Sequence, residues 1–168
     1  LGFCGIGVEG VRALSTALYR NPRLASLNLD SNSLCVRGAA TLSVCLARHT
    51  SLTVLDLGCN YIRELGLRAL VPVLQANTSM RVLRLGCNDV GWTGIGHLVQ
   101  ALGASSALEH LDLSKNNLGG QGAYAMVPLL RTKNRLSGLQ LGSNGISARH
   151  VAHIRLALQC ECAVETAC

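Results

Sequence analysis

A period of 28 residues is the feature that most constrains this chain. Asparagines recur at that interval along most of the sequence, at Asn32, Asn60, Asn88, Asn116 and Asn144. One further step towards the N-terminus reaches Cys4, and the 168 residues correspond to six periods. Self-similarity of this kind indicates a repeat array, in which each unit buries its apolar face against its neighbours.

Each unit has two parts with different apolar spacing. The first part reads LxxLxL, and its alternation places residues such as Leu27 and Leu29 on one face of a short, half-buried strand. The second part has its apolar residues four positions apart, as at Gly66, Leu70 and Leu74, which predicts a helix of about three turns. Successive strands run in the same direction, so they must pair in parallel.

The recurring asparagine follows each predicted strand at a turn. Its amide both donates and accepts hydrogen bonds, so a column of asparagines can satisfy turn backbone groups that stacking removes from water. We therefore interpret the five asparagines as a structural ladder.

Glycine and proline also recur in phase within the helical part. A glycine at the same point of each unit predicts close approach of the helix to the strand or to a neighbouring helix; these glycines are Gly10, Gly38, Gly66, Gly94 and Gly122. Pro72 and Pro128 share one phase, and each is expected to bend its helix outward or to shorten it.

The two ends of the chain fit the period less well. Leu1 aligns with the second leucine of the strand, whereas Val164 aligns with Leu136, the first leucine, so a seventh strand is expected to begin near the C-terminus. The sixth unit departs from the pattern because His150 stands where glycine is expected. We expect residues 1–168 to be a single domain of about six units, open at both ends and cut from a longer array.

The unit LxxLxLxxNxLxxxGxxxLxxxL resembles the ribonuclease-inhibitor-like class of leucine-rich repeats, and five consecutive units satisfy it. The resemblance implies an α/β solenoid with the shape of a right-handed horseshoe. Its parallel β-strands would line the concave face and its helices the convex face. The resemblance also implies a protein that works by binding, but it carries over no particular partner.

The composition indicates whether the chain spans a membrane and whether its compartment is oxidising or reducing. There is no apolar run of about 18 residues, so no membrane span is predicted. The eight cysteines do not form the pattern of a disulfide framework, which favours free thiols in a reducing compartment such as the cytoplasm.

Two groups of cysteines are candidates for chemistry. Cys59 and Cys87 should be stacked neighbours, and packed thiols are favoured over a redox pair or a metal site. Cys160-x-Cys162, together with His150 and His153, suggests zinc, but the Cys-x-Cys spacing is tighter than usual and an ordinary helix end is favoured. We therefore predict no metal and no cofactor.

Charged residues occupy the column of the strand face that runs through Asn28, Asp56, Arg84, Asp112 and Gln140. An arginine between two aspartates is either a surface network worth about 0–1 kcal/mol per pair, or a group presented to a charged partner. On the second interpretation, the partner-binding residues of the concave face are Asp56, Arg84, His110, Asp112 and Lys115.

No catalytic set emerges, so the sequence predicts a non-enzymatic recognition or adaptor module that binds a protein on its concave face. Most of the 15 lysines and arginines lie outside the strands. They complement helix dipoles or bind an acidic protein tail or RNA through the convex side. The alternative function is a structural component of a large ciliary or ribonucleoprotein assembly, docked through that side and the ends. A more remote alternative is a regulator of a small GTPase.

Overall fold

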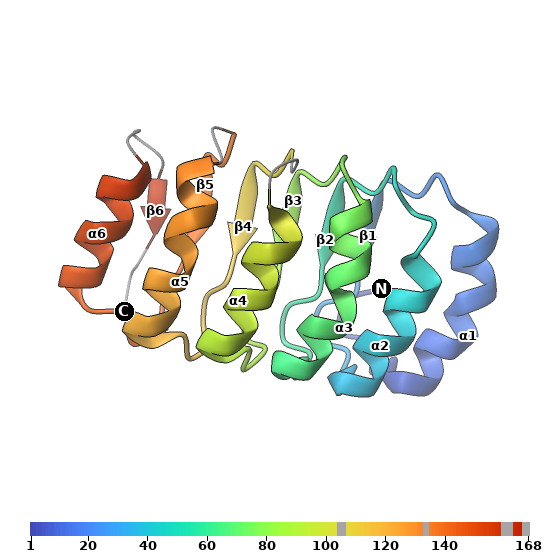
Figure 1. Cartoon of the computed structure of the whole chain (residues 1–168). Helices are drawn as coiled ribbons and strands as arrows, with labels where there is room; N and C mark the ends of the chain where they lie inside the picture. The colour runs from blue at the N-terminus through green and yellow to red at the C-terminus, as the bar shows by residue number, and fades with distance from the viewer. Residues whose placement is uncertain (104–106, 133–134, 159–162, 166–168) are drawn as a thin grey trace.

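The structure, a computed structural model, describes residues 1–103, 107–132, 135–158 and 163–165. Helices and strands alternate throughout these residues (Figure 1), in the order α1 (Gly7–Arg20), β1 (Ser26–Asn28), α2 (Cys35–Leu46), β2 (Val54–Asp56), α3 (Arg63–Ala76), β3 (Val82–Arg84), α4 (Gly91–Leu102), β4 (His110–Asp112), α5 (Gly119–Thr132), β5 (Gly138–Gln140), α6 (Ala148–Leu158) and β6 (Ala163–Glu165). No helix within these residues is long and apolar enough to cross a membrane.

The six strands form one parallel sheet in sequence order. From β1 to β5 each residue pairs with the residue one period later, as Leu27 does with Leu55. All the helices lie on one side of the sheet and stack in the same order (Figure 1). This arrangement confirms the predicted α/β solenoid, with the strands on the concave face and the helices on the convex face. We call the sheet surface that the helices leave open the strand face.

The last strand shifts register. Leu139 pairs with Val164, so the alignment of Val164 with Leu136 is wrong and the last unit is three residues shorter than the others. The helix of this unit, α6, has 11 residues, whereas the other helices of the described chain have 12 or 14. Because α6 ends at Leu158, two periods after α4 ends at Leu102, the three missing residues fall between α6 and β6.

Aliphatic side chains fill the space between the sheet and the helices. Leu27 and Leu29 are both buried, as the alternation predicted, while Ser26 and Asn28 face solvent. The glycine of each helix faces this core. A Cβ at Gly66 would lie 2.7 Å from Cγ2 of Ile62, one turn earlier, and 3.4 Å from Cα of Val36 in α2. The glycine therefore leaves room for its own helix as well as for the neighbouring one.

The two prolines do not shorten their helices. Pro72 lies inside α3 and Pro128 inside α5, and each of these helices has 14 residues, two more than α2 or α4. Pro72 is exposed, so water can reach the carbonyl of Arg68 that the missing N–H would have bonded. The expectation that the prolines shorten their helices is therefore wrong, because both prolines lie on the solvent side of the helix.

The five asparagines form a continuous hydrogen-bonded column beneath the ends of the strands. The Oδ1 atom of Asn60 accepts bonds from the N–H groups of Asn32 (3.0 Å) and Leu34 (3.2 Å). Its Nδ2 group donates to the carbonyls of Leu29 (2.8 Å) and Gly58 (2.8 Å). The same bonds recur at Asn88, Asn116 and Asn144, so each amide joins its own turn to that of the preceding unit.

The turn around each asparagine has an unusual backbone. In the third unit Cys59, Tyr61 and Arg63 all have left-handed φ angles, of 50°, 53° and 58°. Alternating left-handed and right-handed residues turn successive N–H groups to the same side and create a concave site for an acceptor. Here that acceptor is the side-chain oxygen of the next asparagine, which offsets the strain of the non-glycine residues.

In the third unit a second buried amide, Asn77, holds the chain where it returns from the helix to the next strand. In the unit before it, a histidine stands at the same position. Asn77 donates to the carbonyls of His49 and Leu52, both at 2.9 Å, and accepts from the N–H groups of Ser79 and Met80. One period earlier His49 is 2% exposed, and neither ring nitrogen has a hydrogen-bond partner among the described residues.

Replacing His49 with asparagine is therefore expected to stabilise the chain. The new amide can reach the carbonyls of Asn21 and Leu24 as Asn77 reaches its own, and it removes two unpartnered buried nitrogens. We expect a gain of about 1 kcal/mol, measured as a higher urea midpoint at an unchanged m-value. His49→Ala, which removes the ring without supplying an amide, is the control. A lower midpoint for the asparagine variant would contradict this account.

Candidate partner-binding site on the strand face

The strand face carries two rows of outward side chains, one at each end of the three-residue strands. One row contains Ser26, Val54, Val82, His110 and Gly138, and the other contains Asn28, Asp56, Arg84, Asp112 and Gln140. The pairing register therefore places the predicted charge column on neighbouring strands.

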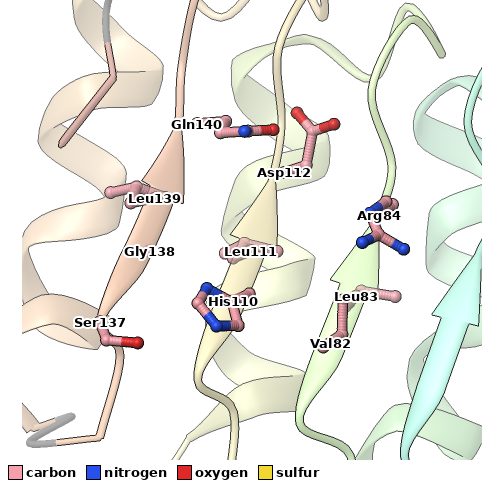
Figure 2. A pocket seen from close by; sticks show the side chains of 10 residues that line it. All are labelled: Val82, Leu83, Arg84, His110, Leu111, Asp112, Ser137, Gly138, Leu139 and Gln140. Atoms are coloured by element: carbon pink, nitrogen blue, oxygen red, sulfur yellow. The ribbon is translucent and has the colours of Figure 1, made fainter. Parts of the chain in front are cut away.

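A hollow of about 270 Å³ lies between β3, β4 and β5 on this face (Figure 2). It is lined by Val82, Leu83, Arg84, His110, Leu111, Asp112, Ser137, Gly138, Leu139 and Gln140. Gly138 supplies no side chain at its outward strand position in this lining. The ring of His110 extends from β4 towards Gly138 (Figure 2), and a Cβ at that glycine would collide with Nδ1 of the histidine.

The charges around the hollow are paired asymmetrically. Nη1 of Arg84 lies 3.5 Å from Oδ2 of Asp56, whose side chain is 13% exposed. Asp112 instead accepts two hydrogen bonds from Ser114, one from its N–H at 2.9 Å and one from its hydroxyl at 2.7 Å. Within the described residues Arg84 thus forms an ion pair with one of its two neighbouring aspartates, so the predicted ladder is half formed.

The bond from Asp112 to Ser114 belongs to a repeated turn. Oδ1 of Asn28 accepts from the N–H of Asp30, and Oδ1 of Asp56 accepts from the N–H of Gly58. Asparagine and aspartate commonly bond to the backbone two residues later in this way. Asn28, Asp56 and Asp112 therefore terminate their strands in addition to facing solvent. The sequence carried a signal for this role, because an asparagine or aspartate stands two positions before the turn in each of these units.

The structure brings three of the five predicted residues together. Arg84, His110 and Asp112 line the hollow, and Asp56 joins them through its ion pair with Arg84. Lys115 lies on the turn after β4 with a φ of 53°, and it is exposed but outside the hollow. Sequence reasoning missed Gly138, although a glycine in a row of larger outward residues was a visible signal.

The structure describes part of the candidate zinc group at the C-terminal end and both cysteines of the candidate thiol pair. No cluster of three or more metal-ligating side chains occurs in the part of the chain that the structure describes. His150 and His153 each pack edge-on against Tyr124, at centroid distances of 5.2 and 5.7 Å. Cys160 and Cys162 lie outside the described residues. Cys59 and Cys87 interact with each other as stacked neighbours, but both are exposed free thiols, so the expectation that the thiols are buried is wrong at these two positions.

Comparisons with known proteins agree with this architecture. The family model described as "Leucine Rich repeat" matches residues 48–71, 76–98 and 104–127. Among solved structures, "Leiomodin-1 Actin-Binding Site 2 (ABS2)" is similar, with a TM-score of 0.69 and 17% sequence identity over 88% of this chain and 86% of that chain. No curated protein matches.

Proposed function

We propose, from the premise that the chain is a leucine-rich repeat protein, that it is a non-catalytic recognition module that binds a protein partner on its strand face. The observation that carries this proposal is the hollow between β3, β4 and β5. Arg84, His110 and Asp112 would form the centre of the contact, with Asp56 and Lys115 on its flanks. The neighbouring solved structure is named for an actin-binding site, so at least one protein of this fold binds a protein.

The hollow offers hydrogen-bond donors more than acceptors. The Arg84 side chain is 49% exposed and contacts Asp56 through Nη1 as an ion pair, and a guanidinium has five N–H donors in all. The carboxylates are less available, because the Asp56 side chain is 13% exposed and Oδ1 of Asp112 already accepts two bonds from Ser114. We therefore propose that a partner inserts an acidic side chain beside Arg84.

Replacing Arg84 with glutamine tests this proposal. The variant keeps a side chain of similar length but removes the charge, so we expect partner affinity to fall about tenfold or more, as when one member of a desolvated ion pair is lost. The measurement is capture of partners from extract on the immobilised chain, followed by titration of the captured protein. Asp56 keeps its bond from Gly58, so the fold should be unchanged.

Arg63→Gln is the matched control. Arg63 forms a more exposed ion pair, with Asp89 at 3.9 Å, and it lies at the start of α3 and outside the hollow. Unchanged capture by the Arg84 variant, or equal loss in both variants, would contradict binding at the strand face.

The alternative is a structural component of a large assembly that docks through its helices. Large apolar side chains on the helices favour it, since each helix exposes one of Tyr19, Val44, Leu65, Trp92, Tyr124 and Leu156. Docking through the basic helical side would leave assembly insensitive to Arg84→Gln and would weaken steeply with salt. We also propose a reducing, cytoplasmic location, which the free thiols of the described cysteines support.

A further inference from the structure

We propose that Cys59 and Cys87 form a reversible oxidation site, in which a peroxide joins the two thiols into one disulfide between adjacent repeats. Neither side chain lines the hollow or belongs to the asparagine ladder, so this inference is independent of the proposed partner site.

The backbone places the two cysteines side by side. The N–H of Cys59 donates to the carbonyl of Gly86 at 2.9 Å, which fixes Cys59 against the turn that contains Cys87. Adjacent parallel segments lie about 4.8 Å apart, and a disulfide requires Cα atoms about 4.4–6.8 Å apart. The φ angles of the two residues are 50° and 56°, so both side chains leave their turns in the same direction.

The side chains also interact with each other, and solvent reaches both of them. The pKa of the Cys59 thiol is raised, first by burial and then by its hydrogen bond with Cys87 and the charge of that thiol. Asp30 raises the pKa further, while a hydrogen bond with Ser31 lowers it. Cys59 is therefore mostly protonated at neutral pH, and oxidation should accelerate as the pH rises and the thiolate forms.

The chemistry balances with a peroxide as the oxidant. The thiolate of one cysteine attacks the O–O bond of hydrogen peroxide, which gives a sulfenic acid and releases the first water after protonation. The second thiolate attacks that sulfur, the S–S bond forms and the sulfenic oxygen leaves as the second water. In total the two thiols lose two electrons and two protons, and one peroxide becomes two waters.

The bond should be easy to reduce again. Because both cysteines have the same backbone conformation, their Cβ atoms keep about the spacing of the repeats, roughly 4.8 Å, whereas a relaxed disulfide has Cβ atoms about 3.5–4.5 Å apart. Closing the bond must pull the turns together. Strained, exposed disulfides have higher reduction potentials than structural ones, which suits a reversible modification.

Peptide mapping tests the proposal on the full chain. The chain is treated with hydrogen peroxide, blocked with iodoacetamide and digested with trypsin. Cleavage after Arg48, Arg63, Arg84 and Lys115 puts Cys59 alone in peptide 49–63 and Cys87 alone in peptide 85–115. We expect these two peptides to be the main disulfide-linked pair, to form faster at pH 9 than at pH 7, and to separate with dithiothreitol.

The linkage should also be intramolecular. Neighbouring thiols have an effective concentration on the order of millimolar or more, so at micromolar chain its yield should not depend on chain concentration. Cys59→Ser and Cys87→Ser must each abolish the linked pair, and no disulfide-linked dimer of the wild-type chain may appear as it forms. Both peptides recovered with blocked thiols, a yield that rises with chain concentration, or a dominant link to Cys4, Cys35 or Cys45 would overturn the proposal.

Discussion

Replacing Asn88 with alanine is expected to destabilise the chain by about 3 kcal/mol or more. Asn88 is 1% exposed, and its Oδ1 accepts from the N–H groups of Asn60 (3.0 Å) and Ile62 (3.1 Å). Its Nδ2 donates to the carbonyls of Leu57 (2.8 Å), Leu85 (3.0 Å) and Gly86 (3.1 Å). Alanine leaves the N–H groups of Asn60 and Ile62 buried without these partners, and each such group costs about 1–3 kcal/mol before water or local rearrangement compensates. The three carbonyls each keep one other donor, from Asn60, Asn116 and Cys59.

The loss should appear in urea denaturation and, locally, in amide hydrogen exchange. Exchange matters because a repeat array can open at one junction while the remaining units stay folded. Asn21→Ala is the control, since Asn21 is exposed and its side chain makes one hydrogen bond within the described residues, to Ala17 at 2.7 Å. That variant should lie within about 0.5 kcal/mol of wild type. Equal effects of the two substitutions would mean that the ladder does not hold the units together.

Replacing Leu85 with alanine is expected to cost about 2–5 kcal/mol, the usual range for a fully buried leucine. Leu85 is 0% exposed and follows β3, where its side chain packs in the core and its N–H donates to the carbonyl of Asp112 at 2.9 Å. The substitution keeps this backbone bond and removes only the side-chain packing, so the cost reports the cavity that remains.

Leu65→Ala provides a matched measurement. It deletes the same atoms from a leucine of α3 that is 59% exposed, so its effect should stay within about 0.5 kcal/mol. The difference between the two urea midpoints measures the contribution of the core. A midpoint that falls equally in both variants would show that Leu65 is covered by another surface, or that the core is looser than the structure indicates.

The architecture could be predicted because the period fixes most of it. Because residues such as Leu27 and Leu55 occupy equivalent positions in successive units, their strands must pair in parallel with a register of one period. The register of β6 could not be predicted in the same way. The sixth unit lacks the usual glycine at His150, and nothing in its spacing signals that the chain returns to the sheet three residues early.

The candidate site was less predictable than the fold. The register brings Asp56, Arg84 and Asp112 into one column, but sequence alone does not decide which aspartate the arginine approaches. Both aspartates bond to their own turns, but Asp112 also accepts the hydroxyl of Ser114, a bond that Gly58 cannot give to Asp56. The lining of the hollow includes Gly138, where the His110 ring occupies the space of the missing side chain, and the direction of that ring could not be read from the sequence.

Site-specific photocrosslinking tests the central claim most directly. A photoreactive amino acid is placed at Ser137, an exposed residue that lines the hollow, or at Arg68, an exposed residue of α3. Each chain is then irradiated in extract. We predict one discrete crosslinked protein from position 137, absent from position 68 and lost when Arg84→Gln is added. Crosslinks that form only from position 68, or equally from both positions, would contradict partner binding on the strand face.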